Sequence, residues 1–182
     1  MNASVYMIGM PASGKSTWGK KLAMAWRWPF IDLDQVIEKN AGMSIVKIFR
    51  QYGEAYFREL EREALHNTRL VKQTVIATGG GAPCFFDNMD FIKNHGVSVF
   101  LDTPMSVLIE RLESKSNNRP LFSNQSSETG LLQKNLDEKL AQRYPFYAQA
   151  HLRLHEPSLT LSDLSAAIRL WAYSQGKGTL IH

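Results

Sequence analysis

Short apolar runs alternate along the chain with longer stretches in which apolar residues recur every three or four positions. The short runs are rich in Val, Ile, Leu and Phe and end in Gly, Asp or Thr, as buried strands do. Four of these runs stand out, and a fifth is weaker: 4–9, 29–34, 74–78, 97–102 and, weaker, 151–155. The longer stretches predict helices over 15–26, 35–40, 44–70, 86–95, 104–114, 131–144 and 162–173.

Strands that alternate with helices predict a three-layer α/β fold, in which helices cover both faces of a parallel sheet. Ligands of such sheets gather beyond the carboxyl ends of the strands. The 182 residues suit a single domain, residues 1–182, and no internal repeat is visible. The segment of about residues 112–130 is rich in Ser and Asn, so we expect a mobile lid there rather than a linker.

The composition is that of an ordinary globular protein, with 44% hydrophobic residues, 21% charged residues and a formal net charge of +4. Because Lys and Arg are scattered, small anionic ligands account for the positive charge as well as nucleic acid does. The only cysteine, Cys84, excludes an internal disulfide and fits a reducing compartment. There is no long apolar stretch and no signal-peptide pattern. We expect a cytoplasmic monomer with small-molecule partners and neither nucleic acid nor a membrane.

The segment Gly9-Met10-Pro11-Ala12-Ser13-Gly14-Lys15-Ser16 matches the P-loop pattern G-x-x-x-x-G-K-[ST]. Its glycines let backbone N–H groups point at phosphate oxygens, and the helix N-terminus that follows attracts negative charge. An apolar run precedes the motif and an apolar stripe at helical spacing follows it, which argues against a chance strand–turn–helix connection. Lys15 is expected to reach the β- and γ-phosphates of ATP, and Ser16 to ligate Mg²⁺. The predicted nucleotide-binding residues are Gly9, Ala12, Ser13, Gly14, Lys15, Ser16 and Thr17.

Two carboxylates, Asp32 and Asp34, end the second predicted strand. Residues two apart in a strand point to the same side, and like charges held together need a cation or a proton-sharing partner. Beside a P-loop, Mg²⁺ and a substrate hydroxyl are the expected partners. The alternative is that Asp34 simply caps the helix that starts at Gln35.

Arg58 and Glu61 lie three residues apart in a predicted helix and, taken alone, are typical of a surface ion pair. Gly79, Gly80 and Gly81 follow the third predicted strand, at the edge where ligands bind. Glycine costs more backbone entropy on folding than any other residue, so three in succession call for a reason. We expect a side chain at Gly80 or Gly81 to occupy space that a ligand needs.

Six segments in this order resemble the shikimate kinase family over roughly residues 4–155: the P-loop, Phe30-x-Asp32-x-Asp34, Phe57-Arg58-x-x-Glu61, Thr78-Gly79-Gly80-Gly81, Arg119-Pro120-Leu121 and Arg143-x-x-x-Tyr147. The resemblance implies a P-loop kinase fold of the nucleoside-monophosphate-kinase type, with a five-stranded parallel sheet. It also implies transfer of the γ-phosphoryl group of ATP to the 3-hydroxyl of shikimate, a step of aromatic amino-acid biosynthesis.

The resemblance assigns substrate-binding roles within a subregion of about residues 34–62 and in two later segments. It implies that Asp34 binds the shikimate hydroxyls and accepts the proton. Arg58 and Arg143 would hold the carboxylate, which matches the planar fork of a guanidinium, and Glu61 would orient Arg58. The substrate ring would lie along Gly79, Gly80 and Gly81.

The resemblance also assigns roles around the nucleotide. Asp32 would sit near Mg²⁺, which Ser16 ligates, while Arg119 on the lid would swing over the phosphates and Arg111 would lie against the adenine. The implied catalytic residues are Lys15, Asp34 and Arg119.

The sequence departs from the family pattern in three places. Ala12 stands where many members carry glycine, the segment after Leu121 is longer and more polar than usual, and the segment near 155–158 matches no adenine-binding pattern. Three rival functions remain. A gluconate or nucleoside monophosphate kinase would not share the Arg58, glycine and Arg143 set. A GTPase-like switch would carry an Asn-Lys-x-Asp motif, which is absent, and an inactive relative would not be expected to keep Lys15, both carboxylates and Arg119.

Overall fold

The computed structural model describes residues 3–116 and 125–175, apart from the side chains of 115–116 and 125–129. Within them the strands are β1 (Ser4–Ile8), β2 (Phe30–Asp32), β3 (Val75–Ala77), β4 (Gly96–Asp102) and β5 (Leu152–His155). The helices are α1 (Lys15–Trp26), α2 (Leu33–Ala41), α3 (Ile45–Asn67), α4 (Asn88–His95), α5 (Met105–Ser116), α6 (Gln125–Tyr147) and α7 (Leu161–Ser174). None of the described helices has the length and apolar character needed to cross a membrane.

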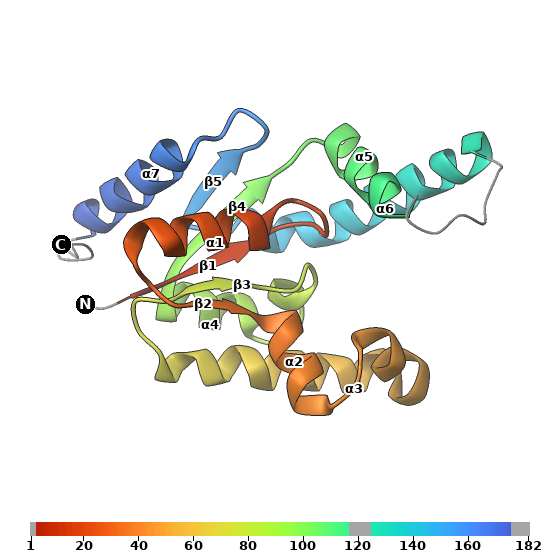
Figure 1. Cartoon of the computed structure of the whole chain (residues 1–182), viewed down its shortest axis with the longest axis horizontal. Helices are drawn as coiled ribbons and strands as arrows, with labels where there is room; N and C mark the ends of the chain where they lie inside the picture. The colour runs from red at the N-terminus through yellow and green to blue at the C-terminus, as the bar shows by residue number, and fades with distance from the viewer. Residues whose placement is uncertain (1–2, 117–124, 176–182) are drawn as a thin grey trace.

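The five strands form one sheet, all parallel, in the order β2-β3-β1-β4-β5 (Figure 1). The chain passes from β1 to β2 and β3 on one side, and then to β4 on the other side of β1. The loop after β1 therefore lies at the point where the strand order reverses, which is where open α/β sheets bind their ligands. The predicted five-stranded parallel sheet is confirmed.

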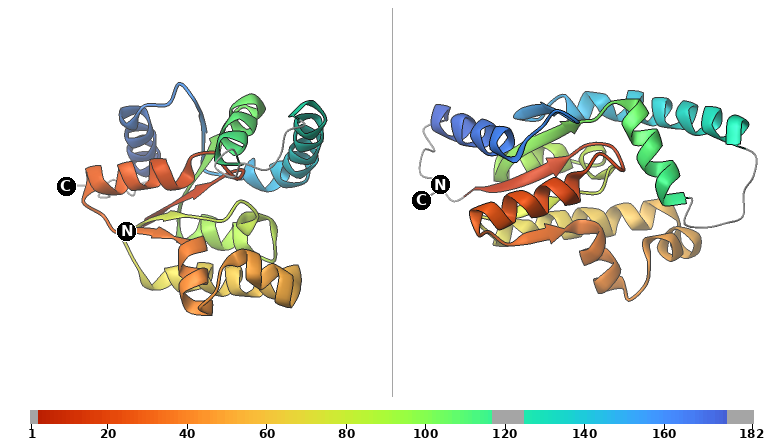
Figure 2. Two further views of the ribbon diagram at one scale, coloured as in Figure 1. Left: turned by 45° about the vertical axis from the view of Figure 1, so that its right-hand side comes forward. Right: turned by 45° about the horizontal axis from the view of Figure 1, so that its top comes forward.

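Residues of β1 alternate between two cores, one on each face of the sheet. Tyr6 and Ile8 are fully buried against side chains of α3, α4 and α6. Val5 and Met7 pack with α1 and α7 on the opposite face, and the two views of Figure 2 keep those two helices side by side. Because helices cover both faces, the three central strands β1, β3 and β4 are buried almost throughout, which makes them recognisable in the sequence. The edge strand β5 instead alternates between half-buried and exposed residues, in keeping with its weaker signal.

The second strand ends earlier than predicted. β2 stops at Asp32, and Asp34 lies in the first turn of α2. Asp32 is the N-cap of that helix, and its Oδ1 accepts a hydrogen bond from the backbone N–H of Asp34 at 3.2 Å. The predicted alternation of two carboxylates along a strand is therefore wrong, and so is the alternative that Asp34 caps the helix. The unpaired N–H groups of a helix start, which attract a side-chain oxygen, bring the two residues together instead.

Parts of the predicted lid are helical. Residues 112–116 belong to α5 and residues 125–130 to α6, because extending an existing helix needs no new nucleus. α6 also continues past Pro145, where we expected it to stop, and the fully buried Tyr147 packs its last turn against the core. Residues 117–124, including Arg119, lie outside the described residues.

Candidate active site

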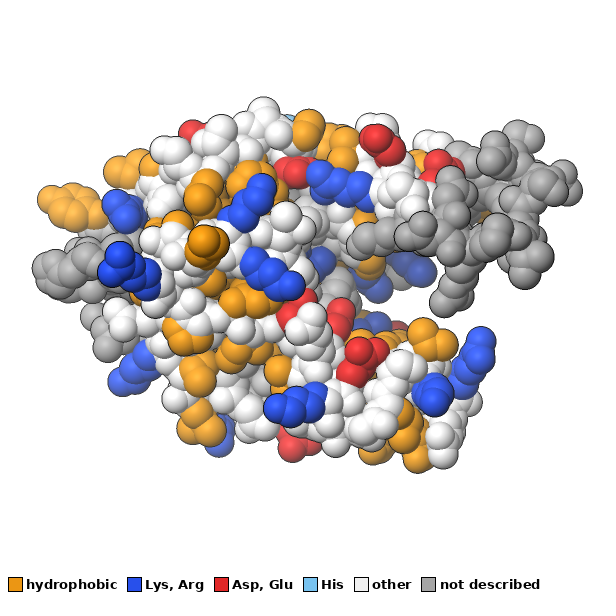
Figure 3. Space-filling model, in the orientation of Figure 1, with side chains coloured by type: hydrophobic (Ala, Val, Ile, Leu, Met, Phe, Trp, Pro, Cys, Tyr) orange, Lys and Arg blue, Asp and Glu red, His pale blue; other side chains and the backbone are white. Residues whose placement is uncertain are grey.

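A cavity of about 600 Å³ opens at the carboxyl ends of β1, β2 and β3. Figure 3 shows the surface hollowed above the part formed by α2 and α3, to the right of α1, with acidic and basic side chains at the edge of the hollow. The cavity is lined by Pro11, Ala12, Gly14, Lys15, Ser16, Thr17, Trp18, Lys21, Asp32, Asp34, Thr78, Gly80, Arg111, Ser114 and Glu156. Residues from five segments of the chain thus meet at the predicted edge of the sheet.

The P-loop turns tightly between β1 and α1. Gly9, Ala12 and Gly14 have φ values of 141°, 63° and 92°, and α1 starts directly after Gly14. Positive φ is the conformation that turns successive N–H groups toward one side, and it is also the conformation that disfavours a Cβ, so Ala12 is strained where the glycines are not. A residue from another segment also contacts the loop, since the hydroxyl of Thr103, which follows β4, donates to the carbonyl of the buried Ser13 at 3.2 Å.

The amine of Lys15 lies over this loop. Its Nζ donates to the carbonyl of Gly9 at 3.0 Å and to that of Met10 at 2.8 Å, and only 8% of the residue is exposed. The side chain therefore folds back across the P-loop from the first turn of α1. A buried ammonium in this position attracts anions into the cavity.

Asp32 and Asp34 have different environments at the same edge. The hydroxyl of Ser16 donates to Oδ2 of Asp32 at 2.6 Å, which brings together two oxygen ligands of the kind that Mg²⁺ prefers. Burial raises the pKa of the Asp34 carboxyl, the charge of Asp32 raises it further, and Lys15 opposes the shift. A carboxylate that binds protons more readily than usual is suited to accept one from a hydroxyl.

Arg58 and Glu61 form a buried ion pair, so the interpretation as a surface pair is wrong. Nη1 of Arg58 donates to Oε2 of Glu61 at 2.6 Å, and the two residues are only 8% and 1% exposed. The guanidinium also lies 4.1 Å from the centre of the Phe85 ring. Burial raises the pKa of Glu61, and the charge of Arg58 opposes that shift. The sheet-side surface of α3 therefore presents a fixed cation.

The three glycines pack against three different parts of the site. A Cβ on Gly80 would lie 2.8 Å from Cδ of Pro11 in the P-loop, and one on Gly81 would lie 2.6 Å from Nη1 of Arg58. A Cβ on Gly79 would collide with Glu61 and come within 3.0 Å of Oδ1 of Asp34. The sequence predicted that side chains here would fill ligand space. The structure adds a different reason, since protein groups of the site already occupy that space.

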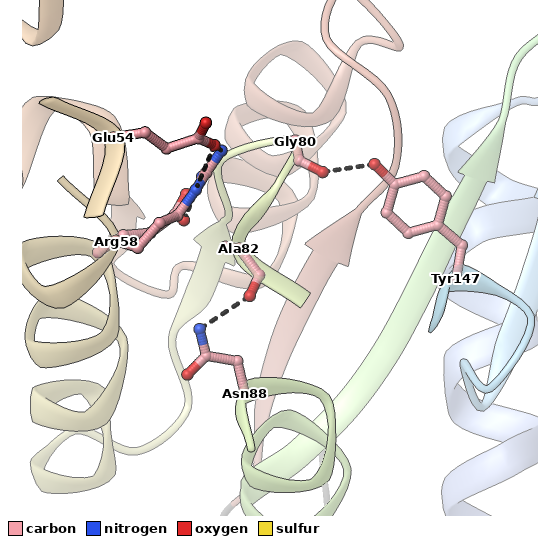
Figure 4. Close-up of polar contacts among 7 residues, drawn as sticks. Glu54, Arg58, Gly80, Ala82, Asn88 and Tyr147 are labelled. Atoms are coloured by element: carbon pink, nitrogen blue, oxygen red, sulfur yellow. Dashed lines mark hydrogen bonds and ion pairs between the residues drawn. The ribbon is translucent and has the colours of Figure 1, made fainter. Parts of the chain in front are cut away.

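Residues 79–82, which we call the glycine loop, are held by two side chains that donate to carbonyl groups of the loop (Figure 4). The hydroxyl of Tyr147, at the end of α6, donates to the carbonyl of Gly80. Nδ2 of Asn88, at the start of α4, donates to the carbonyl of Ala82 at 2.8 Å. The loop that touches Asp34, Glu61 and Arg58 is therefore tied to both α4 and α6.

Arg143 and Arg111 have different surroundings, and only Arg111 lines the cavity. Nη1 of Arg143 is buried and has no hydrogen-bond partner among the described residues, and the charge of Arg143 acts on Glu61 and Tyr147. Buried donors are nearly always satisfied, so an acceptor is expected there. Arg111 donates to the carbonyl of Ala12 at 3.3 Å and to Glu156 at 2.7 Å.

Sequence reasoning missed Glu156 and Asn88. Glu156 is only 5% exposed, pairs with Arg111 and lines the cavity, but nothing in its neighbourhood of the sequence marked it. Asn88 precedes an apolar stripe and is typical of a helix cap, although its amide instead reaches the loop six residues earlier. Of the two residues, only Asn88 had a recognisable sequence pattern, and that pattern predicted a bond to its own helix rather than to Ala82.

The chain is similar to proteins of known activity. The model of the family described as shikimate kinase matches residues 11–167. A shikimate kinase from Phocaeicola vulgatus is 42% identical over 146 residues, which cover 80% of this chain and 82% of that protein.

Solved structures agree with this match. The shikimate kinase from Bacteroides thetaiotaomicron superimposes with a TM-score of 0.80 and 35% identity, over 96% of this chain and 98% of that one. The enzyme from Acinetobacter baumannii, solved in complex with shikimate, gives 0.77 and 30%, over 97% and 95%. A gluconokinase from Sinorhizobium meliloti gives 0.54 at 18% identity, over 95% of this chain and 93% of that one, and shares the fold alone.

Proposed function

The chain belongs to the shikimate kinase family, and on that premise we propose how its own residues phosphorylate the 3-hydroxyl of shikimate with ATP. The products are shikimate 3-phosphate and ADP, in the biosynthesis of chorismate and the aromatic amino acids. One observation carries the assignment of roles. The glycine loop contacts the P-loop, the carboxylate of Asp34 and the guanidinium of Arg58 at the same time, so a phosphate donor and a small acidic polyol fit side by side.

The P-loop side binds ATP in this proposal. The N–H groups from Gly9 to Thr17 surround the phosphates, and Lys15 neutralises charge on the β- and γ-phosphates. Ser16 and Asp32, joined by a 2.6 Å hydrogen bond, would hold Mg²⁺, which when bound neutralises charge on the same phosphates. We propose that the adenine lies against Arg111 and that Arg119 binds the phosphate being transferred. Arg119 lies outside the residues that the structure describes.

The α3 side binds shikimate in this proposal. Arg58, fixed by Glu61, and Arg143, with its unsatisfied buried nitrogen, hold the carboxylate. Asp34 holds the hydroxyl that attacks the γ-phosphorus and accepts its proton, which its raised pKa favours. The backbone of Gly79, Gly80 and Gly81 lies along the ring.

The wider assignments are part of the same proposal. Residues 1–182 act as one kinase domain with a substrate subregion at about 34–62 and a lid at about 112–130, and the enzyme works as a cytoplasmic monomer on small molecules. Nucleic acid and membranes are not partners. Burial raises the pKa of the free thiol of Cys84 to about 11, so the cysteine packs without reacting, as a reducing compartment allows.

The substitution Arg58→Lys tests the carboxylate role, because it keeps the charge and removes the planar fork. We expect KM for shikimate to rise about tenfold or more, with KM for ATP unchanged. Arg62→Lys, on a half-buried arginine of the same helix that pairs with Asp87 instead, is the matched control. Equal weakening of both substrates contradicts the role of Arg58, and rapid turnover of gluconate in place of shikimate contradicts the proposed function itself.

A further inference from the structure

The guanidinium assigned to the substrate carboxylate already binds a carboxylate of the protein. Oε1 of Glu54 accepts hydrogen bonds from Nε of Arg58 at 3.2 Å and from Nη2 at 2.8 Å (Figure 4). Nε and Nη2 form one edge of the guanidinium, and such an edge is the fork that a carboxylate ligand takes up. Glu54 thus occupies a position that a bound acid would need.

The two acidic partners of Arg58 differ in how firmly they are held. Glu61 is 1% exposed and lies inside the site against Gly79. The side chain of Glu54 is 58% exposed, whereas that of Arg58 is 9% exposed. Gly81 lies against the guanidinium, and the Phe85 ring packs over it, so Arg58 is fixed. Glu54 is therefore the partner that is free to leave for water.

The backbone next to Glu54 also breaks the helix. Gly53 has φ 80° and ψ 176° inside α3, so the helical segment that carries Arg58 starts at about Glu54. Space around the Cα of Gly53 is open, since a Cβ there would meet no atom within 4 Å. Glu54 therefore sits at a helix start with room beside it, and its release from Arg58 requires no repacking of the core.

We propose that Glu54 is an internal competitor for the substrate carboxylate, and that its displacement from Arg58 sets the affinity for shikimate. This rests on the proposed carboxylate role of Arg58. Each binding event then exchanges one carboxylate for another on the same fork, so the Glu54–Arg58 interaction subtracts from the binding free energy. An ordinary pair at positions i and i+4 would only stabilise the helix, and its loss would not improve binding. The sign of the effect therefore separates the two interpretations.

The experiment compares Glu54→Gln, Glu54→Asp and the wild type by calorimetric titration with shikimate and, separately, with ATP. Glu54→Gln keeps the shape and loses the charge, so we expect the Kd for shikimate to fall about three- to tenfold. Glu54→Asp keeps the charge but shortens the side chain, so its Kd for shikimate should lie between that of Glu54→Gln and that of the wild type. Glu59→Gln removes the same charge from an exposed position of the same helix and should leave both Kd values unchanged.

Each outcome bears on a different claim. If Arg58→Lys leaves shikimate binding unchanged, the carboxylate role fails and the competition fails with it. If Arg58→Lys weakens binding and Glu54→Gln weakens it too, Arg58 keeps its role and Glu54 is a positioning residue rather than a competitor. If Glu54→Gln has no effect, Arg58 keeps its role and Glu54 neither competes with the substrate nor positions Arg58. In a further outcome, Glu54→Gln and Glu59→Gln tighten shikimate binding equally, with Glu54→Asp equal to the wild type. The effect then comes from the general repulsion between acidic side chains and the substrate carboxylate, and the proposal that Glu54 is displaced from Arg58 is wrong.

Discussion

The P-loop and the wall that holds Arg58 meet at Asp34 and Gly80, which line the cavity, but the two regions are built in opposite ways. The P-loop is one continuous segment whose glycines and helix start determine most of its turns, and Thr103 and Arg111 only donate to two of its carbonyl groups. The wall has no such segment and is assembled from α3, the glycine loop, α4 and α6. A local motif keeps its geometry largely by itself, whereas a composite wall depends on every element that it joins. Substitutions in the two regions should therefore differ in how far their effects spread.

Asp34, where the two regions meet, gives the largest expected effect. Asp34→Asn removes the proton acceptor and should lower kcat about 100-fold or more, with the affinity for ATP largely kept. Asp90→Asn, at an exposed carboxylate, is the control. If Asp34→Asn retains full kcat, the carboxylate is neither base nor hydroxyl anchor.

The same variant has a predictable effect on stability. Folding raises the pKa of Asp34 above the ordinary 3.8, so the folded state disfavours the ionised form. The free energy of unfolding should fall as pH rises from about 3.8 through the raised pKa, and then stay level. Asp34→Asn should therefore raise Tm at pH 7 and lose this advantage toward pH 3. In the wild type, kcat/KM should decline as pH falls through the same raised pKa.

Gly81→Ala should damage the composite wall alone. The added Cβ would lie 2.6 Å from Nη1 of Arg58, so the guanidinium must shift, and KM for shikimate should rise about 10- to 100-fold with KM for ATP unchanged. Combining it with Arg58→Ala identifies the cause. If Gly81→Ala acts by moving Arg58, it should raise KM for shikimate little further once Arg58 is already alanine. If the added methyl group instead fills ligand space, the two substitutions should raise KM independently.

Ala12→Gly should have the smallest effect, confined to the P-loop. Ala12 has φ 63°, a conformation that costs a residue with a Cβ but not glycine, so we expect about 0.5–1 kcal/mol of added stability to urea. Turnover should change less than about twofold, since the N–H directions stay the same. Ala23→Gly, inside α1, should lose about 1 kcal/mol by comparison. A loss of stability in Ala12→Gly would show that the backbone entropy which glycine loses on folding outweighs the strain at this position.

The sheet, the order of its elements and the P-loop were predictable because each has a local cause. Buried parallel strands are apolar throughout, and eight consecutive residues specify the phosphate loop. The interpretation of Asp32 and Asp34 failed on a boundary, since no local signal says that a strand ends two residues early and a helix starts. The burial of Arg58 and Glu61 was invisible for a different reason, since helical spacing gives their separation but not the element that covers them.

The sequence alone determined the phosphate-binding half of this protein and, through its resemblance to a family, the reaction. Only the tertiary structure decided why Gly79, Gly80 and Gly81 are there, because their neighbours come from two distant segments, Pro11 from the P-loop and Arg58 and Glu61 from α3. It also decided that the guanidinium of Arg58 donates to Glu61 through Nη1 and to Glu54 through Nη2. The same holds for the hydrogen bonds by which Asn88 and Tyr147 hold the glycine loop. Contacts between distant residues depend on how the packed layers bring them together, and packing leaves no periodic or local mark along the chain.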